Sequence, residues 1–289
     1  MRALAAWLVA RPQNAVLGLA ATLLLPAPPQ LTSGVIMVLL VLAQGIRLAV
    51  TEALAAAALL VVVSMVFSAP LALVIELMVS TWLPAVLLAL LLMRTRSLAL
   101  TMQVTVILAV VAMAGFYLVV TDPVAFWEPL LARMAEFVIQ SGLELNTELL
   151  TAEIMTLSAT FAFWLLYVAA LLLGYGLFNG LPGEAGRFGW FRDLSFGRVI
   201  ASMMAIASLL ALVVDAAWLQ NIAFILFVVF WVQGLAIVHW LHAQQMLPLG
   251  AVVAIYVLLP LLQVLLLTGL GILGYMDAWF EFRRRMKKA

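Results

Sequence analysis

The sequence has no cysteine, only two histidines, and only two lysines, while charged residues make up 9% of its 289 positions. Without cysteine the chain has no disulfide, thiolate nucleophile or cysteine-ligated metal. The lysines, Lys287 and Lys288, stand in the last three positions, so there is no Walker A lysine. The motifs His-Glu-x-x-His and Gly-x-Ser-x-Gly and the paired Asp motifs of prenyl diphosphate chemistry are also missing. We therefore expect no enzyme, no catalytic residue and no cofactor.

Hydrophobic residues, in contrast, make up 67% of the chain, and its mean hydropathy is +1.24. Soluble domains are about half apolar and about a quarter charged. Open strands leave backbone groups unpaired in lipid, so the membrane-spanning segments are expected to be helices. The composition predicts an all-α, polytopic transmembrane bundle, with the lipid bilayer as a partner and no nucleic acid. We expect no signal peptide, because Arg11-Pro12 interrupts the first apolar run.

Nine segments are long and apolar enough to be predicted as spans, since a crossing needs about 20 apolar residues, and we expect about eight or nine crossings. They are residues 13–29, 31–48, 51–67, 71–93, 98–120, 152–177, 198–215, 219–241 and 248–275.

Arginines in short loops indicate the orientation, because such loops are enriched in Lys and Arg on the cytoplasmic side. With Arg2 and Arg11 inside, four crossings return Arg94 and Arg96 to the same side. The loop 121–151 then lies outside. Its charges agree, since it holds one basic residue, Arg133, against Asp122, Glu128, Glu136, Glu144 and Glu148.

The basic C-terminal tail conflicts with nine simple crossings. Three spans after a cytoplasmic Arg198 would put the tail outside, against the positive-inside rule. Pro260 divides the last apolar stretch, so one solution is a broken or re-entrant pair of half-helices. The alternatives are an early segment that does not cross and a tail that is truly external. We favour a cytoplasmic tail.

The outer loop, 122–150, is predicted to contain an amphipathic helix over 124–140. Apolar residues, among them Leu130, Met134 and Phe137, fall on one face, with Arg133 and Glu136 opposite. We expect Ser141-Gly142 to end this helix and Asn146 to cap the next. Two interpretations stay open: a helix lying on the membrane surface, or a lid over a site that opens outward.

Polar residues within the predicted spans are the candidates for ligand binding, because an ionisable group in hydrocarbon costs about 3 kcal/mol. Glu76 is the first candidate, followed by Ser80 and Trp82; Gln103 and Gln233 are neutral amides of the kind that also join helices. Structural roles are the alternative for all five. Glu52 has Arg47 as its expected partner.

A second candidate set combines basic and aromatic residues at the presumed cytoplasmic side. It consists of Arg187, Trp190 and Arg192 in the loop 179–198, and Asp277, Arg283, Arg284 and Arg285 in the tail. Such mixtures anchor at lipid headgroups or contact partner proteins. We expect Asp277 either to neutralise Arg284 or to make a contact with the loop. His239 and His242 are interpreted as an interfacial pair, and no metal site is predicted.

Three stretches carry a family resemblance: the loop "LFNGLPGEAGRFGWFRDLSFGR", "VQGLAIVHWL" at 232–241, and "GLGILGYMDAWFEFRRR" at 269–285. They resemble the YybS-like bacterial membrane proteins, a family of unknown function. That family is distantly similar to the six-helix S components of energy-coupling-factor vitamin transporters. The resemblance implies a bacterial inner membrane as the location and an S-component-like fold over the first six spans. It also implies docking on a coupling subunit through spaced alanines, here Ala53 and Ala57.

Four regions follow from these patterns: a six-span bundle at 1–178, the loop 179–198, further membrane helices at 199–276 and a basic tail at 277–289. Two functions remain open. One is S-component-like substrate binding for small-molecule uptake, energised by a separate membrane coupling subunit and ATPases. The other is a membrane scaffold or assembly factor that binds another membrane complex through its cytoplasmic loop and tail.

Overall fold

A computed structural model describes residues 2–141, 151–214 and 216–286, and the described chain is helical with no strand. The chain divides into two compact units. Unit 1 comprises residues 1–101 and 165–190, and unit 2 comprises residues 102–164 and 191–289. The predicted all-α, multi-pass architecture is thus confirmed in outline, while the predicted residues Asn146, Glu144, Glu148, Lys287 and Lys288 lie outside the described ranges.

Unit 1 is built around a helix with no polar face. Its elements are α1 (Arg2–Ala10), α2 (Pro12–Leu23), the π-helix η1 (Gln30–Gly34), α3 (Val35–Gln44), α4 (Ile46–Val66), α5 (Leu71–Thr95) and the end of α8 (Ala152–Phe178). Residues 35–42 of α3 are all buried. Gly174 of α8 lets that helix approach Val38, since a Cβ at Gly174 would lie 2.6 Å from the Val38 Cβ. A helix that is apolar all round forms a core.

Unit 2 contains the C-terminal helices and the outer helix. Its elements are most of α6 (Leu98–Val119), α7 (Pro123–Gln140), the start of α8, the short 3-10 helix η3 (Phe191–Asp193), α9 (Gly197–Val213), α10 (Ala217–Val228), α11 (Phe230–Ala243), α12 (Leu249–Leu258), α13 (Gln263–Phe280) and α14 (Phe282–Met286). The element α7 confirms the helix predicted at 124–140. Asp122 caps it by accepting from the backbone N–H groups of Val124 and Ala125.

Six of the described helical stretches are long and apolar enough to cross a membrane. They are Ile46–Val66, Leu71–Thr95, Leu98–Val119, Ile154–Phe178, Ala217–Ala243 and Gln263–Phe280. Shorter apolar helices cover Gln30–Gln44, Gly197–Val213 and Leu249–Leu258. The predicted first span, 13–29, corresponds to the 12-residue helix α2, so the count of nine full-length spans is not confirmed.

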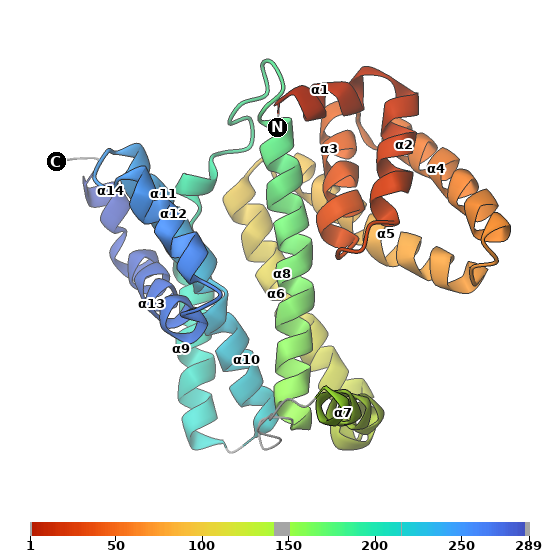
Figure 1. Ribbon diagram of the computed structural model, residues 1–289. Helices are drawn as coiled ribbons and strands as arrows, with labels where there is room; N and C mark the ends of the chain where they lie inside the picture. Colours follow the sequence, from red (N-terminus) through yellow and green to blue (C-terminus); the bar gives the residue numbers. More distant parts are fainter. Residues whose placement is uncertain (1, 142–150, 215, 287–289) are drawn as a thin grey trace. The chain divides into compact units, whose positions relative to one another are not determined.

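The last apolar stretch, predicted as a single span or a broken pair, consists of two helices. Helix α12 ends at Leu258, a turn occupies 259–262 around Pro260, and α13 begins at Gln263. Proline lacks a backbone N–H and clashes with the preceding helical turn, which explains the break. The two helices form a hairpin within unit 2 (Figure 1).

Glycines bring α11 and α13 into backbone contact. A Cβ at Gly274 would overlap the carbonyl oxygen of Phe230, and a Cβ at Gly234 would overlap that of Leu270. The small residues of "GLGILG" therefore allow the close approach that such patterns favour in membrane helices. This contact fixes the position of α13 along α11, and hence where the C-terminal end of α13 lies within unit 2.

Substituting Gly274 with alanine tests this contact. We expect Gly274→Ala to lower the thermal midpoint of the detergent-solubilised protein, because the added methyl group meets backbone that cannot rotate away. Overpacking of this kind costs about 1–3 kcal/mol. Gly269→Ala is the matched control in the same helix, where an added Cβ meets nothing within 4 Å. An equal loss of midpoint in both variants would contradict the account.

Candidate functional site

The most polar buried site in unit 2 is an ion pair between Asp277, near the end of α13, and Arg283 in α14. The Nη2 of Arg283 lies 2.6 Å from Asp277 Oδ2, and its Nε lies 3.1 Å from the same oxygen. Asp277 is 3% exposed and Arg283 8% exposed. Both charges are therefore removed from solvent and depend on each other.

Arg283 also binds the chain segment that precedes α9. Its Nη1 donates to the carbonyl oxygen of Arg192 at 2.7 Å, and its Nη2 donates to that of Leu194 at 2.7 Å. Together with the two bonds to Asp277, four of the five guanidinium N–H donors have partners. The tail is thus bonded to the loop.

Two glutamines hold the same segment from other helices. Gln233 of α11, fully buried, accepts from the backbone N–H of Phe196 at 2.7 Å and donates to Asp277 at 3.0 Å. Gln103 of α6 donates to the carbonyl oxygen of Ser195 at 3.2 Å. Residues 191–198 are therefore fixed by α6, α11, α13 and α14, and the polar groups that fix them lie far apart in sequence.

The local backbone explains how Asp277 and Arg283 meet. Six residues apart, they would not share a face of one continuous helix. The chain leaves the helix at Glu281, which has a left-handed backbone with φ of 51°, and then starts α14. This turn carries Arg283 back over Asp277. Residues other than glycine adopt positive φ at an energetic cost that the surrounding bonds must sustain.

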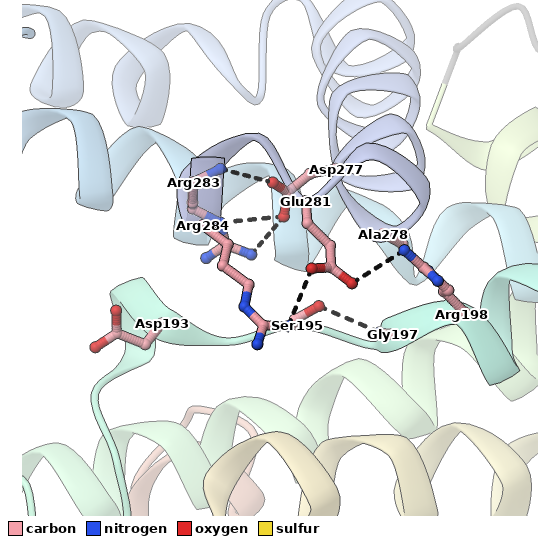
Figure 2. Close-up of a pocket in the computed structure, with 9 residues that line it drawn as sticks. All are labelled: Asp193, Ser195, Gly197, Arg198, Asp277, Ala278, Glu281, Arg283 and Arg284. Carbon is pink, nitrogen blue, oxygen red and sulfur yellow. Dashed lines mark hydrogen bonds and ion pairs between the residues drawn. The ribbon is translucent and has the colours of Figure 1, made fainter. Parts of the chain in front are cut away.

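A partly open cavity of about 480 Å³ lies beside the ion pair and is drawn in Figure 2. Among the residues that line this cavity, Arg198 and Arg284 both form ion pairs with Glu281, at 3.3 and 3.2 Å. Their side chains are 63% and 74% exposed, so these surface pairs contribute little stability. Sequence reasoning missed Glu281, Arg198 and Ser195 as site residues, because only the fold places them together.

The residues predicted for ligand binding are divided between the two units. Glu76 is exposed on α5 and has no bonding partner among the described residues. Ser80 and Trp82 have structural contacts in unit 1: the Ser80 carbonyl accepts from the Tyr167 hydroxyl at 2.8 Å, and Trp82 donates to Ser33 at 2.7 Å. Gln103 and Gln233 belong to the loop network of unit 2.

The predicted contact residues are divided in the same way. Arg192, Asp277 and Arg283 meet in unit 2, while Arg285 is exposed and Arg284 lines the cavity. Arg187 and Trp190 belong to unit 1, where Arg187 pairs with Glu184 at 2.8 Å and the Trp190 ring covers Gly186. The expected Asp277 to Arg284 pair is wrong, since Asp277 binds Arg283. The expected alternative was a contact between Asp277 and the loop, and Asp277 is joined to the loop through Arg283, which donates to the Leu194 carbonyl.

Two further expectations are corrected. Glu52 is bonded by Gln44, at 2.9 Å, while Arg47 is exposed and makes no ion pair with it, because α4 begins at Ile46 and carries Arg47 outward. Ala53, expected on a docking face, is buried within unit 1. His239 and His242 have separate partners, the Tyr256 hydroxyl and the Leu247 carbonyl, each at 2.9 Å.

No protein-family model matches this chain, and neither a curated protein nor a solved structure matches it.

Replacement of Arg283 tests how much this network contributes to the stability of the protein. We expect Arg283→Met to destabilise the protein by about 3–5 kcal/mol, because it leaves the Asp277 carboxylate buried without a counter-charge. The measurement is the thermal midpoint of the monodisperse protein in detergent. Arg284→Met, one residue away at an exposed pair, is the control and should change stability by less than about 1 kcal/mol. Similar losses in the two variants would refute a special role for Arg283.

Proposed function

We propose that this chain is a membrane scaffold or assembly protein of a bacterial inner membrane, which holds a partner protein at one charged surface. We call this surface the loop–tail face and define it as residues 191–198 together with 277–286. The proposal rests on one observation: three buried polar side chains, Gln233, Asp277 and Arg283, are used to fix a short loop.

Burying these polar side chains costs free energy, and this cost supports a binding role for the loop that they hold. A buried ion pair is often no more stabilising than apolar residues of the same volume, so it is weak evidence for stability. What the pair supplies is a fixed position for residues 192–196. A preorganised surface loses less conformational entropy when a partner binds, and binding surfaces gain affinity in this way.

The orientation of the face is part of the proposal. We propose that α2, α3, α4, α5, α6, α8, α9 and the continuous α10–α11 stretch cross the membrane, giving eight crossings. The α12–α13 hairpin then enters and leaves on one side. This arrangement puts the loop 179–198 and the basic tail on the cytoplasmic side, in agreement with the positive-inside rule. We also propose that the chain is related to the YybS-like membrane proteins, which it resembles in three stretches.

Small-molecule uptake is a second candidate, favoured by a buried polar seam in unit 1. The Ser33 hydroxyl, in the π-helix η1, donates to the Leu19 carbonyl at 2.9 Å and accepts from Trp82. The neighbouring Thr81 hydroxyl is buried and has no partner among the described residues. π-Helical segments are frequent at functional sites. The exposed position of Glu76 and the burial of Ala53 weigh against an S-component mode of action.

Co-purification separates the two functions. The tagged protein is purified in mild detergent from its native host, and bound proteins are identified by mass spectrometry. The scaffold function predicts a stoichiometric protein partner other than transport subunits. Recovery of coupling ATPases with a membrane coupling subunit would replace it with the uptake function.

A charge reversal on the loop–tail face locates the partner surface. Arg285→Glu changes an exposed residue of the face. We expect it to lower recovery of the partner roughly fivefold, because the reversal replaces complementary charges at the interface with like charges, which repel. Arg133→Glu, an exposed residue on α7, is the matched control and should leave recovery unchanged. Unchanged recovery with Arg285→Glu would exclude this face as the contact surface.

A further inference from the structure

The cavity on the loop–tail face lies at the ends of two apolar helices. Gly197 and Arg198 begin α9, while Ala278 and Glu281 stand at the end of α13, and all four line the cavity. Immediately beyond, the exposed side chains of the two helices are apolar: Val199 is 69% exposed and Met276 42% exposed. In membrane proteins this transition from exposed apolar to charged side chains marks the level of the lipid headgroups.

Two guanidinium groups face this cavity and are held beside each other. Glu281 forms an ion pair with Arg198 through one carboxylate oxygen and with Arg284 through the other, so a single side chain positions both arginines (Figure 2). Each arginine keeps further N–H donors for an additional acceptor. Arginine donors in pairs are the usual partners of phosphate oxygens, because charge-assisted bonds of this kind are short and strong.

Other groups at the cavity also favour a ligand that carries a phosphate group. Helix α9 starts there, and the amino-terminal end of a 17-residue helix adds positive potential for an anion. The Asp277 and Arg283 charges, which form the inner wall, cancel each other. Asp193 lines the cavity too, so the site carries both signs of charge and does not repel a headgroup that is neutral overall.

We propose that this cavity binds the phosphodiester group of a membrane phospholipid, with Arg198 and Arg284 donating to its oxygens. The lipid is then part of the protein surface, held between α9 and α13. This inference goes beyond the scaffold function and does not depend on it, because lipid binding is measured on the purified chain without any partner.

Native mass spectrometry of the full-length protein in detergent tests the site. Dioleoyl phosphatidylethanolamine is titrated into delipidated protein, and the fraction of protein with one bound lipid is recorded. We expect Arg198→Ala and Arg284→Ala each to weaken binding about tenfold, the effect of losing one charge-assisted contact. Size-exclusion profiles and thermal midpoints matching the wild type show that the variants are folded, as expected for exposed side chains.

The matched control is Arg94→Ala, which removes an exposed arginine from the last turn of α5 and touches no part of this cavity. We expect this variant to bind lipid as the wild type does. Equal weakening in all three variants would show only general attraction between basic residues and lipid, and would overturn the proposal, as would wild-type binding in Arg198→Ala and Arg284→Ala.

The source of the phosphate is tested with two further probes. Dioleoylglycerol has the same chains without phosphate, and we expect it to bind without any sensitivity to Arg198 or Arg284. Phosphoethanolamine, the headgroup alone, should compete only weakly, because it lacks the chains that lie against the apolar helix surfaces. Full displacement of the lipid by the headgroup alone or by inorganic phosphate would identify a soluble anion site in place of a lipid site.

Discussion

The ion pair between Asp277 and Arg283 is the interaction on which the arrangement of unit 2 depends. Both side chains are almost fully buried within unit 2, so each charge requires the other as a partner. The pair also connects α14 to residues 192–194, which the fold brings close although they precede α14 by about ninety positions. One interaction thus joins the tail, the end of α13 and the loop before α9.

The ion pair between Asp277 and Arg283 can reach the loop only because the chain reverses direction between α12 and α13. If the last apolar stretch were one continuous crossing, Asp277 would lie at the end of unit 2 away from the loop. The break at 259–262 reverses the chain, and the glycines of α11 and α13 allow the backbone contact that sets the final position. Packing thereby brings Gln233 within 3.0 Å of Asp277, and the buried amide completes the network.

Hydropathy and turn residues were sufficient to predict most helices. The predicted spans 71–93, 98–120 and 152–177 agree closely with α5, α6 and α8, and Pro260 correctly indicated a broken final stretch. The short N-terminal helices were less predictable, because hydropathy counts apolar residues across a loop such as 24–29 without seeing where the helix ends. A long apolar run is consistent with a span or with two shorter helices.

The candidate site was predictable only in part. Gln233 and Asp277 could be singled out, since polar residues in apolar helices need partners, but their partners could not be named from sequence. Arg283 follows Asp277 by six residues, a spacing that has meaning only once Glu281 leaves the helix. Glu76 shows the limit of such reasoning: an acidic residue within a span was singled out as a ligand candidate, whereas the structure exposes it on α5.

The central claim is that the tail and the loop 179–198, whose Arg192 and Leu194 carbonyls accept from Arg283, lie on one side of the membrane. The absence of cysteine allows a direct measurement with single cysteines at three exposed positions, Ala185, Met286 and Ser141, labelled in oriented membrane vesicles with an impermeant maleimide. The account predicts that cysteines at 185 and 286 are labelled from the same side and cysteine 141 from the other. Labelling of cysteine 286 together with cysteine 141 would contradict it.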